Sequence, residues 1–177
     1  MNQRGFTLIE FVIYIGIVTF VLIASLTFAW TIINDQIKQG NLIEVNYHGG
    51  FIMQKVLYYS QRASTVDAQT VYNTNPGKLV LNYPTNPQIV IDTYQKQITL
   101  GGNPVTITKL RFQEGVSTAI DLTSDEVTVN NFSITNLSTA NVTTFRVDLD
   151  LEAVNPSGSK TYEAQNAWTI SATLRQK

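Results

Sequence analysis

Closely spaced carboxylates are the residues of this chain that could bind a metal ion. Two groups stand out, one along a predicted strand and one in a predicted loop: Asp148, Asp150 and Glu152, and Asp121, Asp125 and Glu126. Calcium takes about six to eight oxygen ligands that converge on one point. Carboxylates on one face of a strand point the same way and do not converge, so we interpret the first group as a solvated face. Calcium binding by the loop group stays open, and neither group is assigned as a metal site.

Other groups that carry out catalysis are scarce. The chain has no cysteine, and its one histidine, His48, has no second imidazole with which to share a metal. Serine and threonine are abundant, but no base is spaced to activate one as a nucleophile. The stretch Gly101-Gly102-Asn103-Pro104 is typical of a turn and not of a phosphate-binding loop. We therefore expect no catalytic residue, no metal and no cofactor, and we expect that the protein is not an enzyme.

Glu10 is an ionisable residue at the border of a long apolar segment. Residues 11–33 contain no charged side chain, and they exceed the roughly 20 apolar residues that a helix needs to cross a bilayer. An ionisable group in hydrocarbon is costly and is more often functional than incidental. Alternatively, Glu10 lies at headgroup level or near the helix N-terminus, where a negative charge is favoured by about 0.3–1 kcal/mol. Position and charge alone leave both interpretations open.

The apolar segment is predicted to be a membrane span and not a cleavable secretory signal. Such a signal has a shorter apolar region followed by a small-x-small cleavage site, and none follows Ile33. Arg4 precedes the span, which predicts a cytoplasmic N-terminus. The chain is then a single-pass protein of the inner (cytoplasmic) membrane, extracytoplasmic from about Asp35 onward.

A helix is predicted to continue through residues 34–64, because no proline occurs before Pro76. Small and apolar residues at alternating steps of four and three define a face that can pack on a folded domain: Val45, Gly49, Ile52, Val56, Tyr59 and Ala63. Glycine weakens a helix by about 1 kcal/mol relative to alanine. The pair Gly49-Gly50 therefore predicts either a kink or a close approach to a sheet.

After residue 64, short β-rich runs separated by Asn, Gly and Pro predict an antiparallel sheet. We expect strands at about residues 78–83, 88–94, 97–100, 105–113 and 126–135, and a hairpin over residues 143–175. The apolar phase slips within 105–113 and within 126–135, which predicts a bulge or bend in each. The fold class is α+β, with a long N-terminal helix packed on a C-terminal antiparallel sheet.

The stretch Gly5-Phe6-Thr7-Leu8-Ile9-Glu10, directly before an uncharged span, resembles the processing site of type IV prepilins and pseudopilins. The resemblance implies that prepilin peptidase cuts between Gly5 and Phe6 and that Phe6 is then N-methylated. Glu10 corresponds to the glutamate at the family's fifth mature position. The implied partners are this peptidase, other pilin or pseudopilin subunits and an inner-membrane assembly platform. No nucleic acid partner is expected, because the net charge is only -1.

Cleavage before Phe6 would create an ammonium four residues from Glu10, and Glu10 of a neighbouring subunit could neutralise it. Two buried charges in contact cost far less than either alone, and such a pair is better suited to setting register than to holding subunits together. We expect Glu10 to have no partner before this cut. Lateral packing of the spans is expected to do most of the holding.

The resemblance divides the chain into a leader (residues 1–5), a transmembrane half-helix (6–33), an amphipathic half-helix (34–64) and an extracytoplasmic β-rich domain (65–177). Major subunits of the family often have a proline in the span and a C-terminal disulfide, and this chain has neither. These departures favour a minor pilin. The alternatives are a type II secretion pseudopilin, a subunit of a competence filament, and a membrane-anchored surface protein that binds a ligand and never polymerises.

Overall fold

The computed structural model describes the chain except for residues 1–6, 86, 156–157, 160–161 and 175–177. One helix, α1, precedes eight strands: α1 (Leu8–Ser60), β1 (Thr65–Val66), β2 (Lys78–Asn82), β3 (Ile89–Leu100), β4 (Asn103–Glu114), β5 (Ile120–Asp121), β6 (Val127–Asn136), β7 (Thr144–Ala153) and β8 (Gln165–Thr173). Two antiparallel sheets form, in the orders β1-β2-β3-β4-β5 and β6-β7-β8. The α+β fold class is confirmed.

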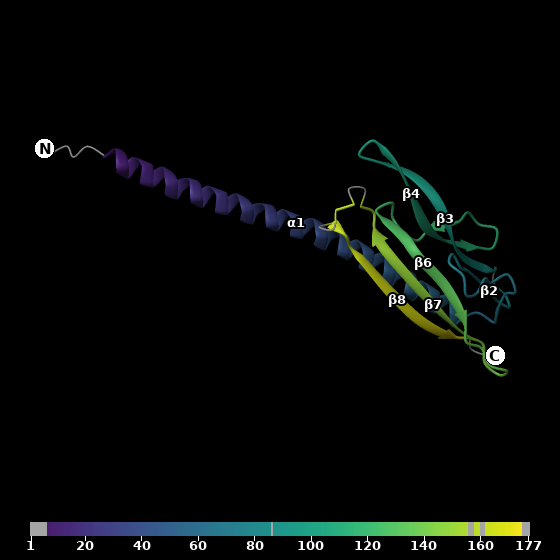
Figure 1. Cartoon of the computed structure of the whole chain (residues 1–177). Helices are drawn as coiled ribbons and strands as arrows, with labels where there is room; N and C mark the ends of the chain where they lie inside the picture. The colour runs from purple at the N-terminus through teal and green to yellow at the C-terminus, as the bar shows by residue number, and fades with distance from the viewer. Residues whose placement is uncertain (1–6, 86, 156–157, 160–161, 175–177) are drawn as a thin grey trace.

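Helix α1 runs without a break for 53 residues. Its N-terminal half extends away from the sheets as a rod, and its C-terminal half lies against the β6-β7-β8 sheet (Figure 1). Val45, Ile52 and Val56 of the predicted face are fully buried. Tyr59 is half-buried, and Ala63 is buried but lies beyond the helix, which ends at Ser60.

The glycine pair in α1 marks a close approach to a sheet and not a break in the helix. A Cβ atom on Gly49 would lie 2.3 Å from Cζ2 of Trp168, a residue of β8. The neighbouring Gly50 has no atom within 4 Å of the same position. Only the first glycine therefore faces the sheet, and its missing side chain makes room for an indole ring.

The hairpin predicted over residues 143–175 is confirmed as β7 and β8. Phe145, Val147, Leu149 and Leu151 alternate along β7 and all are at most 1% exposed. They form one hydrophobic core with the buried face of α1 and with Leu79, Leu81, Ile89 and Ile91 of the other sheet. This core holds the two sheets and the helix together as a single unit.

Of the two phase slips, the one in β6 is a bulge and the one in β4 is not. The register of β6 against β7 shifts between Val129 and Asn131, so Asn130 is the extra residue. The pairing of β3 with β4 is continuous over all of Ile89–Leu100, so of the predicted bulge or bend, a bulge against β3 is excluded. Lys109 and Leu110 are neighbours in β4, so their side chains lie on opposite faces of the strand, and both are buried. Both faces of β4 are therefore covered there, and the apolar residues change face without an extra residue.

The strands predicted at 88–94 and 97–100 are one strand, β3, because their pairing with β4 never breaks. The chain between β1 and β2 lies along β6, where Asn73 N donates to Ile134 O at 2.7 Å and Gly77 N donates to Phe132 O at 2.7 Å. Thr108 N of β4 donates to Thr128 Oγ1 of β6 at 3.1 Å. These bonds join the two sheets along one seam.

Candidate functional site at the N-terminal helix

Thr7 and Glu10 form a reciprocal cap at the start of α1. Thr7 has an extended backbone and is the N-cap residue, and its hydroxyl accepts from Glu10 N at 3.4 Å. In return, Glu10 Oε2 accepts from Thr7 N and from Thr7 Oγ1, each at 3.0 Å. This capping box occupies backbone donors that a helix start otherwise leaves unpaired.

The expectation that Glu10 has no partner before cleavage is therefore wrong, because its carboxylate already binds Thr7. The pattern Thr-x-x-Glu before an apolar run is a sequence signature of a capping box and was sufficient to predict this contact. Gly5 and Phe6, the residues expected to flank the cleaved bond, lie outside the described residues.

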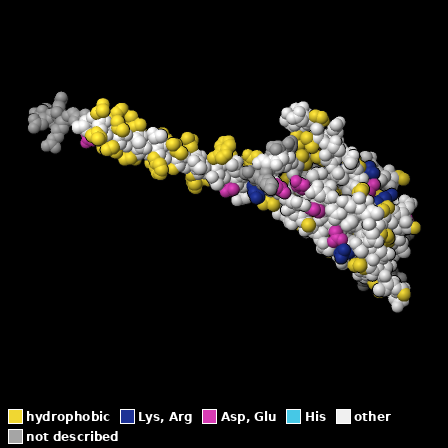
Figure 2. Space-filling view, in the orientation of Figure 1, with side chains coloured by type: hydrophobic (Ala, Val, Ile, Leu, Met, Phe, Trp, Pro, Cys, Tyr) yellow, Lys and Arg dark blue, Asp and Glu magenta, His cyan; other side chains and the backbone are white. Residues whose placement is uncertain are grey.

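The first half of α1 presents apolar side chains that no other described part of the chain covers (Figure 2). Leu8 is 84% exposed, Phe20 75% and Leu26 70%. By length and composition, α1 is the one described helix that could cross a membrane. An apolar surface of this extent marks a membrane or protein contact.

Two hydroxyls within this apolar half, those of Thr27 and Thr31, are satisfied by the helix itself. Thr27 Oγ1 donates to Ile23 O at 2.9 Å, and Thr31 Oγ1 donates to Thr27 O at 3.0 Å. A polar group in hydrocarbon must find such a partner, because no water is available there. These threonines are therefore compatible with an apolar surrounding.

Polar contacts fasten the middle of α1 to the strand-rich part of the chain. The hydroxyl of Tyr162 donates to Asn34 Oδ1 at 3.3 Å, and Asn41 Nδ2 donates to Tyr162 O at 3.0 Å. Asn166 Nδ2 donates to Asn46 Oδ1 at 2.7 Å. The helix is thus held to the domain from its midpoint, and only its apolar half projects.

His48 is one of these fastenings. Its Nδ1 lies 3.0 Å from Leu122 O, and its Nε2 lies 3.0 Å from Glu44 Oε1 one turn earlier on α1. The imidazole is 13% exposed and both nitrogens face acceptors. His48 therefore links the helix to the segment that follows β5, a role that its position in the sequence did not indicate.

Two of the three loop carboxylates considered for calcium, Asp121 and Asp125, are paired with lysines. Lys109, whose side chain is 3% exposed, lies 2.7 Å from Asp125 and 3.2 Å from Asp121, and Lys96 lies 2.8 Å from Asp125. Hydrogen bonds from Lys109 and then Lys96 hold the pKa of the Asp125 carboxyl below its usual range. Two ammonium groups thus balance two of the three loop carboxylates, Asp121 and Asp125.

The strand carboxylates likewise have partners within the sheet: Arg146 for Asp148, Gln165 for Asp150 and Asn130 for Glu152. Across the described ranges, no group of three or more His, Cys, Asp or Glu side chains is arranged to hold a metal ion.

Comparison with known proteins gives one match. Residues 1–26 fit the family model of the prokaryotic N-terminal methylation motif. No curated protein and no solved structure matches the chain. The match covers the capping box and the first part of the exposed apolar half of α1, so it coincides with the region that the fold leaves uncovered.

Proposed function

We propose that this chain, which carries the type IV pilin/pseudopilin signal at its N-terminus, is a minor pilin-like subunit of a type IV pilus-like filament. Prepilin peptidase cuts between Gly5 and Phe6, Phe6 is N-methylated, and the mature helix enters the filament. The observation that carries this proposal is the methylation motif placed directly before a capped, uncovered apolar helix.

The remaining features follow the proposed division of the chain. Arg4 keeps the N-terminus cytoplasmic, residues 6–33 span the inner membrane, and residues 65–177 form the extracytoplasmic domain. The domain lies at the tip or surface of the filament, where it primes assembly or is presented to the outside. The partners are the peptidase, other pilin or pseudopilin subunits and the assembly platform in the inner membrane.

Apolar burial supplies the driving force for insertion of α1 into the membrane, and helix packing then holds it among other subunits. Side chains such as Leu8, Phe20 and Leu26 are mostly exposed in the single chain, and each gains about 1.5–3 kcal/mol when it leaves water for hydrocarbon or for a neighbouring helix. Before assembly the bilayer takes this surface, and after assembly the spans of other subunits take it. The work of the chain is structural.

Glu10 has two functions in this proposal. In the single chain its carboxylate caps α1 through Thr7. In the filament it also approaches the ammonium of Phe6 from a neighbouring subunit, a charge-assisted contact that sets the register of the helices. Substitutions can therefore remove the charge of Glu10 and the cap of α1 separately.

Two substitutions at Glu10 test this distinction. Glu10→Gln keeps an oxygen that can accept from Thr7, whereas Glu10→Ala loses both the cap and the charge. We expect both variants to insert into membranes as wild type does, and both to be depleted at least tenfold from sheared filaments. Thr7→Val, which removes the cap hydroxyl but keeps the carboxylate, is the matched control and is expected to assemble.

Incorporation of Glu10→Gln at the wild-type level would contradict the charge pairing. If Thr7→Val and Glu10→Ala are depleted from filaments while Glu10→Gln is retained, the defect is assigned to the cap. A membrane-anchored protein that never polymerises would be absent from sheared filaments even as wild type. A pseudopilin carries the same signal, and it would be identified by a block in the export of folded proteins when the chain is deleted.

A further inference from the structure

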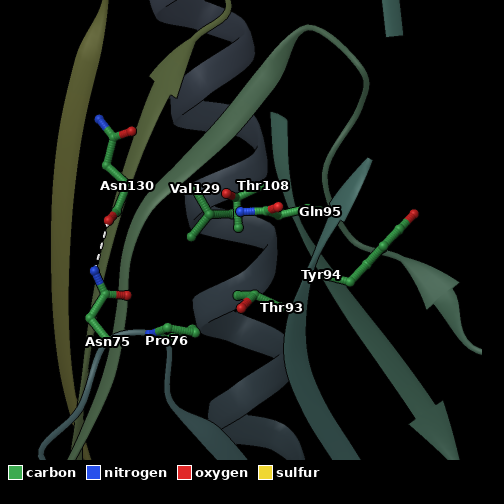
Figure 3. Close-up of a pocket in the computed structure, with 8 residues that line it drawn as sticks. All are labelled: Asn75, Pro76, Thr93, Tyr94, Gln95, Thr108, Val129 and Asn130. Atoms are coloured by element: carbon green, nitrogen blue, oxygen red, sulfur yellow. Dashed lines mark hydrogen bonds between the residues drawn. The ribbon is translucent and has the colours of Figure 1, made fainter. Parts of the chain in front are cut away.

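A cleft of about 230 Å³ lies at the seam between the two sheets (Figure 3). Its lining comes from β3, β4, β6 and the chain that follows β1, and consists of Asn75, Pro76, Thr93, Tyr94, Gln95, Thr108, Val129 and Asn130. None of these side chains carries a formal charge at neutral pH. The cleft is outside the helix half that assembly uses.

One wall of the cleft carries polar groups with unused hydrogen-bonding capacity. Thr93 and Gln95 lie on the same face of β3, and Thr108 of β4 pairs directly with Gln95. No side-chain hydrogen bond joins any of the three to another described residue, and Figure 3 shows them gathered together. The ring of Tyr94 points to the other face, where its hydroxyl donates to Asp121 at 2.8 Å.

The opposite wall is held in place by its own hydrogen bonds. Asn75 Nδ2 donates to Asn130 O at 3.0 Å, and Asn75 Oδ1 accepts from Phe132 N at 3.2 Å. Asn130 is the extra residue of the β6 bulge, and its Nδ2 donates to Glu152. Val129 lines the cleft but is only 6% exposed and belongs to the core, so exposed Pro76 supplies most of the apolar surface of this wall.

The polar wall continues toward the tip of the β3-β4 hairpin. Gln97 and Thr99 of β3 and Thr106 of β4 follow on the same face, and all three are exposed. Their side chains also lack a hydrogen bond to any other part of the chain that the structure describes. An uncharged row of hydroxyls and amides thus leads from the cleft along the hairpin.

This chemistry favours a neutral ligand whose own groups both donate and accept. A threonine hydroxyl and a glutamine amide can each do both, which matches the hydroxyls of a sugar. Pro76 opposite them is apolar and exposed, which suits the C–H face of a sugar ring. A charged ligand would meet no opposite charge in the lining and would lose hydration without compensation.

We propose that this cleft binds a neutral carbohydrate, with one sugar ring in the cleft and further sugars of the same chain along Gln97, Thr99 and Thr106. The cleft, at about 230 Å³, is smaller than the roughly 300–1,000 Å³ of pockets for drug-sized ligands. It therefore suits one sugar ring, and the further sugars lie outside it. The inference goes beyond filament assembly, and its binding test does not require a filament.

The test uses the full chain in a zwitterionic detergent, because glycoside detergents would compete for the cleft. Saturation-transfer NMR is recorded with chitotriose, cellotriose and maltotriose as neutral probes. Trigalacturonate is the charged probe, and a hexapeptide of Gly, Ser and Thr is the peptide probe. We expect at least one neutral trisaccharide to bind and the charged and peptide probes not to bind.

Substitutions then locate the site. Gln95→Ala and Thr108→Val each remove one hydrogen-bonding group and should weaken binding roughly threefold to tenfold, as loss of one hydrogen bond predicts. Thr118→Val makes the same chemical change at an exposed position outside the cleft and should bind as wild type does. Unchanged urea midpoints would show that the variants are folded.

The proposal is overturned if none of the three neutral sugars binds at millimolar concentration, or if trigalacturonate binds equally well. Binding of the peptide probe alone would assign the cleft to a different class of ligand and would also overturn it. Equal loss in Thr118→Val, or no loss in Gln95→Ala and Thr108→Val, would place any sugar binding elsewhere on the chain.

Discussion

At Gly49 the helix backbone touches the indole ring of Trp168, and this contact decides which glycine of the pair is required. Gly49→Ala adds a Cβ 2.3 Å from a ring atom, so we expect a net destabilisation of about 1–3 kcal/mol despite better helix propensity. Gly50→Ala, with no atom within 4 Å, should instead stabilise by up to about 1 kcal/mol.

Urea unfolding of the full chain in detergent measures both variants. Trp168 fluorescence reports on the domain once Trp30, the other tryptophan, is replaced by Phe. Midpoints that shift in the same direction by the same amount would contradict the packing at Gly49. The sequence left a kink and a close approach to a sheet both open, and it could not indicate the ring at Gly49, because Trp168 is 119 residues away in the chain.

Asp125 gives the domain a pH dependence. Its pKa is lowered by the hydrogen bonds from Lys109 and Lys96, so the stability it contributes is present above its unfolded-state pKa of about 4 and is lost as the pH falls through the lower folded value. The half-exposed pair is worth about 0.2–1 kcal/mol. We expect Asp125→Asn to unfold at lower urea than wild type at pH 7, and the difference between the two midpoints to be smaller at pH 3. A constant difference between them at both pH values would refute this ion pairing.

Among the elements, α1 has two surfaces of opposite character on opposite sides of the helix. Ile52 is fully buried in the core, and Ile43 is 69% exposed. Ile52→Ala should lower the free energy of unfolding by about 2–5 kcal/mol, and Ile43→Ala should change it by less than about 0.5 kcal/mol. The same urea titration compares them, and similar losses in both would contradict the face that packs on the sheets.

Element types could be predicted from local pattern, and their pairing only in part. The alternation in residues 143–175 sufficed for β7 and β8, because one face of each is buried. In β4 the same rule failed, since Lys109 is buried by Asp121 and Asp125 while Leu110 is buried in the core on the other side. A buried lysine looks polar in the sequence, so periodicity assigns it to the surface.

The cleft between the sheets could not be predicted from the sequence, because tertiary contacts build it. Its walls come from segments as far apart as Asn75 and Asn130, and only the bulge in β6 was visible beforehand. The capping box differs, because Thr7 and Glu10 are three residues apart and their pairing is local. Local chemistry could be predicted from this sequence, and sites built by tertiary contacts could not.

For the whole molecule, the division between an uncovered apolar half-helix and a packed domain accounts for its proposed place in a filament. Residues 8–33 leave apolar side chains exposed, whereas a single core joins both sheets to the second half of α1. The domain can therefore stay folded while the first half passes from bilayer to neighbouring subunits. Nothing in the packed half has to rearrange for this transfer.

The most direct test is the intact mass of the chain recovered from sheared filaments of the cells that express it. The account predicts that the chain is present there and that its mass is lower than that of the unprocessed chain by residues 1–5, apart from one added methyl group. A chain missing from the filaments, or one that still carries residues 1–5, would contradict it.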